Sequence, residues 1–127
     1  MPPETIRALM ARYFAATRKM DVEAWLSCFA EDAVSHDPYG GTPLEGKEAL
    51  RRFFIGVTDA FTAIDFTEDY LVVTADRAAV KFTAHGTGKN GRSAKAEGID
   101  VFEVNRQGTI QIMWGYWDPS ALLSQLR

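Results

Sequence analysis

The chain has little of what several classes of protein require. Among its 127 residues there is one cysteine, Cys28, which excludes an intramolecular disulfide and a cysteine-based metal site. The two histidines have no further ligand at metal-binding spacing, so we expect no metal centre. A single cysteine is also what the reducing cytoplasm favours, and we expect a cytoplasmic protein.

Positive charge and long apolar runs are scarce as well. The formal net charge is −3 and the sequence pI is about 5.3. The basic residues form no stripe that could follow a phosphate backbone, which argues against nucleic acid as a partner. No apolar run approaches the roughly 20 residues that span a bilayer, and no signal-peptide pattern is present, so we expect no membrane contact. The length fits a single domain over residues 1–127.

Aromatic residues, in contrast, are abundant. The chain holds 8 Phe, 4 Tyr and 3 Trp, and 46% of its residues are hydrophobic. So many large apolar side chains could line a pocket or form a dimer surface in addition to filling a core.

The first half of the chain has helical periodicity. Apolar spacing predicts three helices, over residues 3–19, from the N-cap Asp21 to about residues 30–32, and over 46–60. Residues 33–36 are expected to be extended, and the Pro- and Gly-rich residues 37–46 to form a loop.

The second half changes to strand periodicity. Four strands joined by short turns are predicted as an antiparallel meander, followed by a short terminal helix over about 118–126. The strands are Ile64–Val73, Ala78–Thr87, Ala94–Val104 and Thr109–Trp117. This order of elements predicts the α+β class.

Alternation along the strands separates an inner face from an outer face. A three-residue loop between the second and third long strands would place Phe82 opposite Gly98 and Val80 opposite Asp100. His36 and His85 would then point away from the inner face. The inner face and the third helix supply the expected pocket residues: Val80, Phe82, Gly98, Met113, Gly115, Trp117, Phe53 and Phe54. The outer face is apolar enough to predict a homodimer surface, through Ile99, Val101, Ile110, Ile112, Trp114 and Tyr116.

Three polar residues interrupt this apolar pattern. Tyr13 lies on the apolar stripe of the first helix, Asp37 begins an Asp-Pro-Tyr-Gly turn, and Asp100 lies within an apolar strand. Burial should raise the pKa of Asp100 and make it a hydrogen-bond donor, while Asp37, in a more solvated turn, should stay ionised. A base, a neutral acid and a phenol are the groups that move a proton beside a carbonyl.

Each of the three also has a purely structural interpretation. Tyr13 could be a core tyrosine bonded to a backbone carbonyl, and Asp37 could be a turn residue. Asp100 would be exposed if the predicted strand parity were shifted by one residue.

Several segments of the chain resemble the bacterial Δ5-3-ketosteroid isomerases, in the same order and over nearly the whole length. The resemblance is carried by Leu9 to Tyr13, Ala30 to Ala33, Asp37 to Gly40, Gly46 to Glu48, Ile99 to Val101 and Tyr116-Trp117. It implies the cone-shaped fold of nuclear transport factor and the SnoaL-like proteins, in which a curved sheet wraps around three N-terminal helices. It also implies a homodimer and no organic cofactor.

The resemblance assigns roles to the three polar residues. It implies that Asp37 carries a proton from C4 to C6 of a 3-oxo-Δ5-steroid, and that Tyr13 and Asp100 hold the dienolate oxygen. Three positions depart from the family. Phe29 and Phe54 stand where the best-known members have tyrosines behind the oxyanion-hole tyrosine, and His36, just before the base, stands where relatives carry an acid. A steroid delta-isomerase is therefore the first hypothesis, with a small apolar ketone as its substrate. A polyketide cyclase or dehydratase, or a non-catalytic ligand-binding module, are the alternatives.

Overall fold

A computed structural model describes all 127 residues, as four helices and six strands. In chain order these are α1 Pro3–Arg18, α2 Val22–Leu26, β1 Phe29–His36, β2 Leu44–Glu45, α3 Gly46–Thr58, β3 Phe61–Thr74, β4 Arg77–Gly88, β5 Ser93–Val104, β6 Ile110–Tyr116 and α4 Pro119–Ser124.

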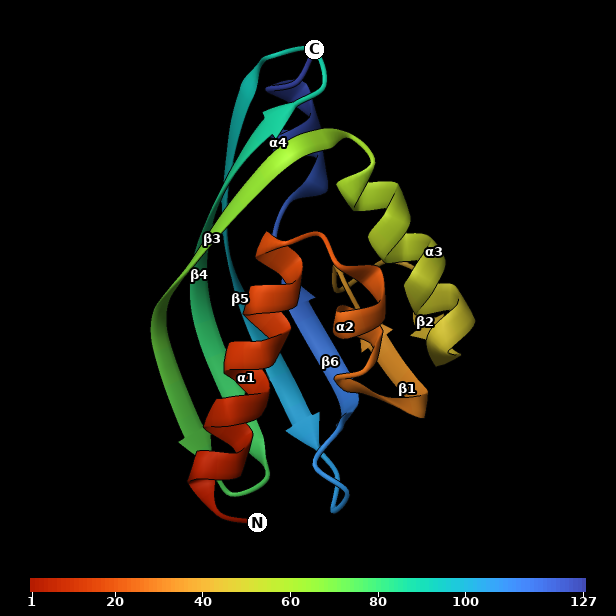
Figure 1. Cartoon of the computed structure of the whole chain (residues 1–127), viewed down its shortest axis with the longest axis vertical. Helices are drawn as coiled ribbons and strands as arrows, with labels where there is room; N and C mark the ends of the chain where they lie inside the picture. The colour runs from red at the N-terminus through yellow and green to blue at the C-terminus, as the bar shows by residue number, and fades with distance from the viewer.

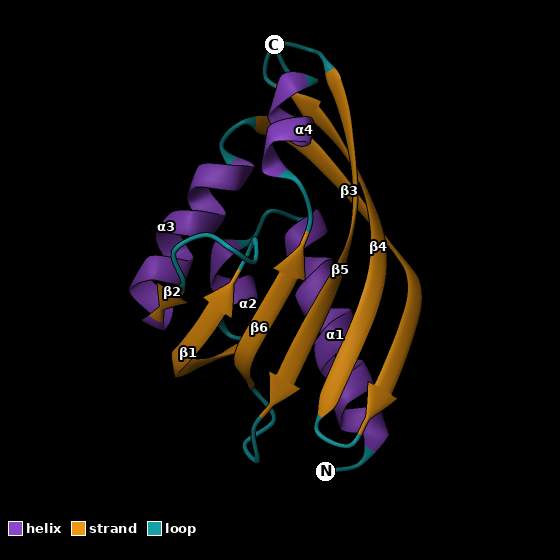
Figure 2. Ribbon diagram, turned by 180° about the vertical axis from the view of Figure 1, so that it is seen from behind, coloured by secondary structure: helices purple, strands orange, loops and turns teal.

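All six strands form one sheet in the order β2-β1-β6-β5-β4-β3. The strands β3 to β6 are the predicted antiparallel meander, whereas β1 pairs in parallel with β6. The sheet is curved, with α1, α2 and α3 lying on one of its faces (Figure 1) and the other face left uncovered by these helices (Figure 2). The predicted α+β fold, a curved sheet around three N-terminal helices, is confirmed.

The helix α1 attaches to the sheet through one apolar side. Its buried residues recur at helical spacing, with Phe14 fully enclosed and Tyr13 only 5% exposed. A buried aromatic cluster joins the helix to the sheet, since the rings of Tyr13 and Phe102 on β5 lie 5.0 Å apart. The tyrosine is thereby fixed in the core while its hydroxyl can face the interior.

The second helix is shorter than predicted. Asp21 caps it as expected, accepting a hydrogen bond of 3.1 Å from the Ala24 amide, but α2 ends at Leu26 and β1 begins at Phe29. The helical pattern fails there because the carbonyl of Cys28 accepts a hydrogen bond from the amide of Ile110, at 2.8 Å, and draws the chain into the sheet beside β6. The two-residue strand β2, within the predicted loop, was also not anticipated.

The predicted strand register is confirmed at the positions that matter for the site. Phe82 pairs with Gly98, and Val80 pairs with Asp100. On its other side Asp100 pairs with Gly115 of β6. Asp100 therefore lies on the concave, helix-covered face and is 4% exposed.

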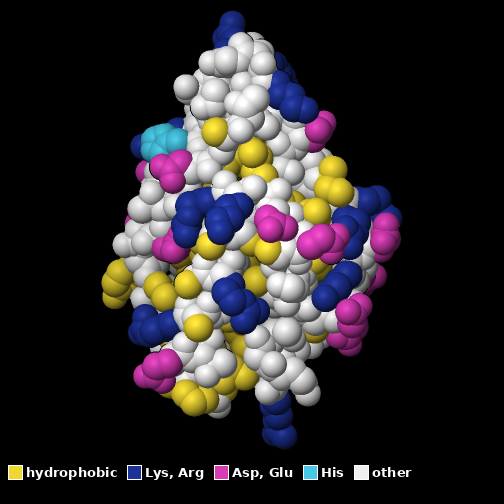
Figure 3. Space-filling model, in the orientation of Figure 1, with side chains coloured by type: hydrophobic (Ala, Val, Ile, Leu, Met, Phe, Trp, Pro, Cys, Tyr) yellow, Lys and Arg dark blue, Asp and Glu magenta, His cyan; other side chains and the backbone are white.

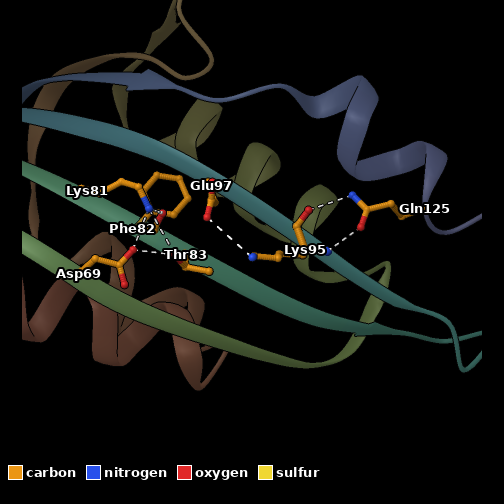
Figure 4. A network of polar contacts seen from close by, with 7 residues as sticks. All are labelled: Asp69, Lys81, Phe82, Thr83, Lys95, Glu97 and Gln125. Carbon is orange, nitrogen blue, oxygen red and sulfur yellow. Dashed lines mark hydrogen bonds and ion pairs between the residues drawn. The ribbon is translucent and has the colours of Figure 1, made fainter.

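The outer face of the sheet has two unlike halves. Over β3, β4 and β5 it carries a network of polar side chains (Figure 4), in which the Lys81 ammonium lies 2.8 Å from the Asp69 carboxylate. Near β1 and β6 it is apolar, with Ile99 and Tyr116 each 46% exposed. His36 belongs to this half, since its ring stacks on Trp114 with an interplanar angle of 11°.

On the helical side, charged groups of both signs are interspersed over the surface (Figure 3). None of the helices is long and apolar enough to cross a membrane.

Candidate active site

A cavity lies between the helices and the concave face of the sheet. The space among its lining residues measures about 760 Å³ with the open mouth and adjoining solvent included, and 13 of the 19 lining residues are hydrophobic. Along β4 and β5 it runs from Asp100 past Ala84 and Ala96 to Gly86. Tyr13, Asp37 and Asp100 all line it, so the structure brings the three predicted polar residues together.

Tyr13 enters the cavity from α1. Aromatic rings surround it, and its hydroxyl donates a hydrogen bond of 3.5 Å to the sulfur of Met113. A thioether is a weak acceptor, so a ligand oxygen would be a better partner for this hydroxyl. Burial raises the pKa of Tyr13 well above its ordinary value, and the Asp100 and Asp37 carboxyls raise it further. Tyr13 is therefore protonated, as a hydrogen-bond donor must be.

Asp100 is held by β5 in nearly apolar surroundings. No protein group forms a hydrogen bond to its carboxyl. Every fully enclosed side-chain nitrogen or oxygen in the protein has a hydrogen-bond partner, so the unpaired oxygens of Asp100 are not fully enclosed. They open onto the cavity that Asp100 lines. Burial, and then repulsion from Asp37, raise the pKa of Asp100 well above its ordinary value. A protonated Asp100 can donate to a ligand oxygen.

Asp37 follows β1 and begins a turn that is fastened to β6. The amide of Tyr39 donates to the carbonyl of Gly115 at 2.7 Å, and the Asp37–Pro38 peptide bond is cis. The indole N–H of Trp117 donates to Asp37 Oδ1 at 2.5 Å. Asp37 is less solvated than predicted: burial raises its pKa to about 6, although the Trp117 hydrogen bond lowers it. Above that pH it is a carboxylate and can serve as a base.

Gly115 is what lets the two carboxyls approach each other. A Cβ added at this position would overlap Asp37 Oδ1, and would lie 2.9 Å from Asp37 Cγ and 3.3 Å from Asp100 Oδ1. Both carboxyls thus lie against the same face of this glycine. Two acids so close cannot both ionise easily, which favours one proton shared unequally between them.

The predicted pocket wall needs a correction at four positions. Phe53, Phe54, Phe82 and Trp117 line the cavity, but Val80, Gly98, Met113 and Gly115 do not. Val80 and Met113 are packed in the core beneath the wall. The two glycines do leave room, but the protein fills it, with the Asp37 carboxyl over Gly115 and the Phe82 ring over Gly98, 2.7 Å from where a Cβ would lie.

Other lining residues were not among those predicted. Ala84 and Ala96 follow from the same strand alternation that selected Phe82, so that pattern could have named them. Trp25 on α2 and Leu122 on α4 reach the cavity through helix packing, which strand parity cannot reveal. His85, predicted to point away, is exposed and lies at the edge of the cavity.

The aromatic shell behind Tyr13 contains few polar groups. The ring of Phe29 lies 6.1 Å from that of Tyr13, and Phe54 stacks on Trp25 at 4.5 Å. Neither phenylalanine can donate a hydrogen bond to the phenol. The cavity also holds no group of His, Cys, Asp and Glu side chains that could bind a metal ion.

The family model of the SnoaL-like domain matches residues 10–113. The chain belongs to the SnoaL-like family. A curated steroid delta-isomerase of Nocardioides simplex is 26% identical over 119 residues, which cover 93% of this chain and 94% of that protein. The family identified from the sequence is thus confirmed, and the named activity is that of the relative.

Solved structures agree on the fold. The epoxide hydrolase/cyclase-like enzyme SalBIII, described in pyran ring formation in the polyether salinomycin, superimposes with a TM-score of 0.82 at 27% identity, covering 93% of this chain and 94% of its own. RV0760c from Mycobacterium tuberculosis superimposes with a TM-score of 0.81 at 23% identity, covering 95% and 96%. The steroid delta-isomerase and SalBIII, the two proteins above that are named by an activity, are both enzymes.

Proposed function

We propose that this protein is a steroid delta-isomerase, which moves the double bond of a 3-oxo-Δ5-steroid into conjugation with the ketone. The proposal depends most on one observation: two carboxyls whose pKa values are raised by burial line an otherwise apolar cavity together with a tyrosine hydroxyl. The similarity to the Nocardioides simplex enzyme supports the substrate class.

The three side chains divide the reaction between them. The Asp37 carboxylate removes a proton from C4, and the electrons of the broken C–H bond move onto the C3 oxygen to give a dienolate. Tyr13 and protonated Asp100 donate hydrogen bonds to that oxygen, which stabilises the charge as it forms. Asp37 then returns the proton to C6, and the double bond moves from C5–C6 to C4–C5. No oxidant or other reactant is consumed.

The test is the absorbance of the conjugated enone after the protein is mixed with 5-androstene-3,17-dione. The wild type should convert the substrate faster than buffer does, and Asp37→Asn should remove most of that activity. Asp100→Ala should lower kcat by about 10²–10³-fold, the usual loss for one oxyanion-hole donor. Asp100→Asn is the matched control, because it keeps a donor and should lose less. No conversion by folded wild-type protein would overturn the proposal.

A second candidate is a cyclase or epoxide-opening reaction on an apolar substrate, as the likeness to SalBIII suggests. The same groups could serve, with Asp100 donating its proton to an epoxide oxygen and Asp37 accepting one from an attacking hydroxyl. The enone assay separates the two reactions, since a cyclase would leave 5-androstene-3,17-dione unchanged and would close a hydroxy-epoxide into a cyclic ether.

A further inference from the structure

The indole of Trp25 is a polar group of the cavity that has no role in the proposed reaction. The hydroxyls of Thr17 and Thr58, which also line the cavity, donate to carbonyls of their own helices at 3.0 and 2.8 Å. The Trp117 indole is bonded to Asp37. The indole N–H of Trp25, in contrast, has no hydrogen-bond partner within 3.5 Å, although the residue is only 2% exposed.

The free N–H of Trp25 reaches the cavity. Every fully enclosed side-chain nitrogen in the protein has a hydrogen-bond partner. Because the indole nitrogen of Trp25 has none, it is not fully enclosed and has access to open space. The accessible space beside this buried residue is the cavity that it lines together with Tyr13 and Asp100. An unpaired donor in such a place carries a desolvation cost that a hydrogen bond would remove.

The indole is held firmly next to Tyr13. It stacks on Phe54 with ring centroids 4.5 Å apart, and it packs against Phe29 at 4.7 Å. Its ring lies 6.0 Å from the Tyr13 ring. Burial and the two carboxyls raise the pKa of Tyr13, whereas hydrogen bonding from the Trp25 side chain lowers it.

We propose that Trp25 is a positioning residue for the oxyanion hole, whose indole N–H donates to the phenolic oxygen of Tyr13 when Tyr13 donates its proton to a ligand oxygen. A phenol oxygen can donate and accept at once, and two such bonds in series strengthen each other. The indole would supply the hydrogen bond to the Tyr13 oxygen that no hydroxyl can supply from positions 29 and 54, because both of these residues are phenylalanines. This inference rests on the proposed function only in requiring that Tyr13 binds an oxygen that carries negative charge.

The test uses substituted phenols as ligands, whose ionisation in the site is read from ultraviolet absorbance. Trp25→Phe keeps an aromatic ring against Phe54 and removes the N–H. The pH at which a bound phenol ionises should then rise by about one unit, a roughly tenfold change in the ratio of ionised to neutral ligand. Phe29→Leu is the control, because it loosens packing around both rings without removing a donor, and it should leave that pH nearly unchanged.

Equal shifts in Trp25→Phe and Phe29→Leu, or no shift in either, would overturn the inference. A second measurement needs no variant: the indole proton of Trp25 in isotope-labelled wild-type protein should move downfield when a phenolate binds, and an unmoved signal counts against the proposal. Neither measurement requires turnover, so failure of the isomerase assay would leave both tests valid. If isomerisation is observed, Trp25→Phe should lower kcat more than it changes KM.

Discussion

Replacing Trp117 with phenylalanine should weaken Asp37 as a base at low pH. The Trp117 indole donates to Asp37 Oδ1 and favours the ionised carboxyl, so its loss leaves burial unopposed and raises a pKa that is already about 6. A hydrogen bond to a charged group contributes about 1.5–3 kcal/mol, or roughly 1–2 pKa units, which predicts a new pKa of about 7–8.

The assay is the pH dependence of kcat/KM for enone formation. Wild-type activity should rise as Asp37 loses its proton, with a midpoint near pH 6, and the midpoint for Trp117→Phe should lie about 1–2 units higher. Above pH 9 the two proteins should differ much less, because Asp37 is ionised in both. Trp114→Phe, on the outer face, is the control and should keep the wild-type midpoint. An unchanged midpoint in Trp117→Phe would refute the assigned hydrogen bond.

Three further changes test other parts of the site and the surface. Asp37→Asn should remove activity yet stabilise the fold above pH 6. Burial raises this pKa from 3.8 to about 6, so Asp37 costs the wild type on the order of 3 kcal/mol of unfolding free energy as pH rises through that window. Urea denaturation at pH 4 and pH 8 should therefore show a smaller loss in Asp37→Asn, where only Asp100 of the two carboxyls still contributes. Gly115→Ala should displace the Asp37 carboxyl and lower kcat at least tenfold with an unchanged circular dichroism spectrum, whereas Gly56→Ala, in open space, should be neutral. Ile99→Glu should turn a dimer into a monomer in sedimentation if the apolar outer half is the homodimer surface that we propose, and a monomeric wild type would contradict that proposal.

Strand parity and register could be predicted from the sequence because both are local. A three-residue loop sets the pairing of β4 with β5, so the position of Asp100 on the concave face followed from alternation alone. The helical stripe of α1 placed Tyr13 inward for the same kind of reason.

Features that depend on distant contacts could not be predicted. The early end of α2 is imposed by Ile110, more than eighty residues away in the chain, and periodicity carries no trace of that bond. The desolvation of Asp37 depends on how its turn folds over Gly115. That protein side chains, and not a ligand, fill the space beside Gly98 and Gly115 likewise depends on packing between distant parts of the chain. The reach of Trp25 into the cavity likewise comes from helix packing.

The opposite protonation states of Asp37 and Asp100 are the central claim, and a carbon NMR titration of the two labelled carboxyls tests it most directly. Assignment would come from Asp37→Asn and Asp100→Asn, each of which removes one signal. The structure predicts that Asp37 titrates near pH 6 and that Asp100 titrates well above its ordinary value. An Asp100 signal that titrates near the ordinary value of about 4 would contradict the account, because an ionised Asp100 cannot donate a hydrogen bond to a substrate oxygen.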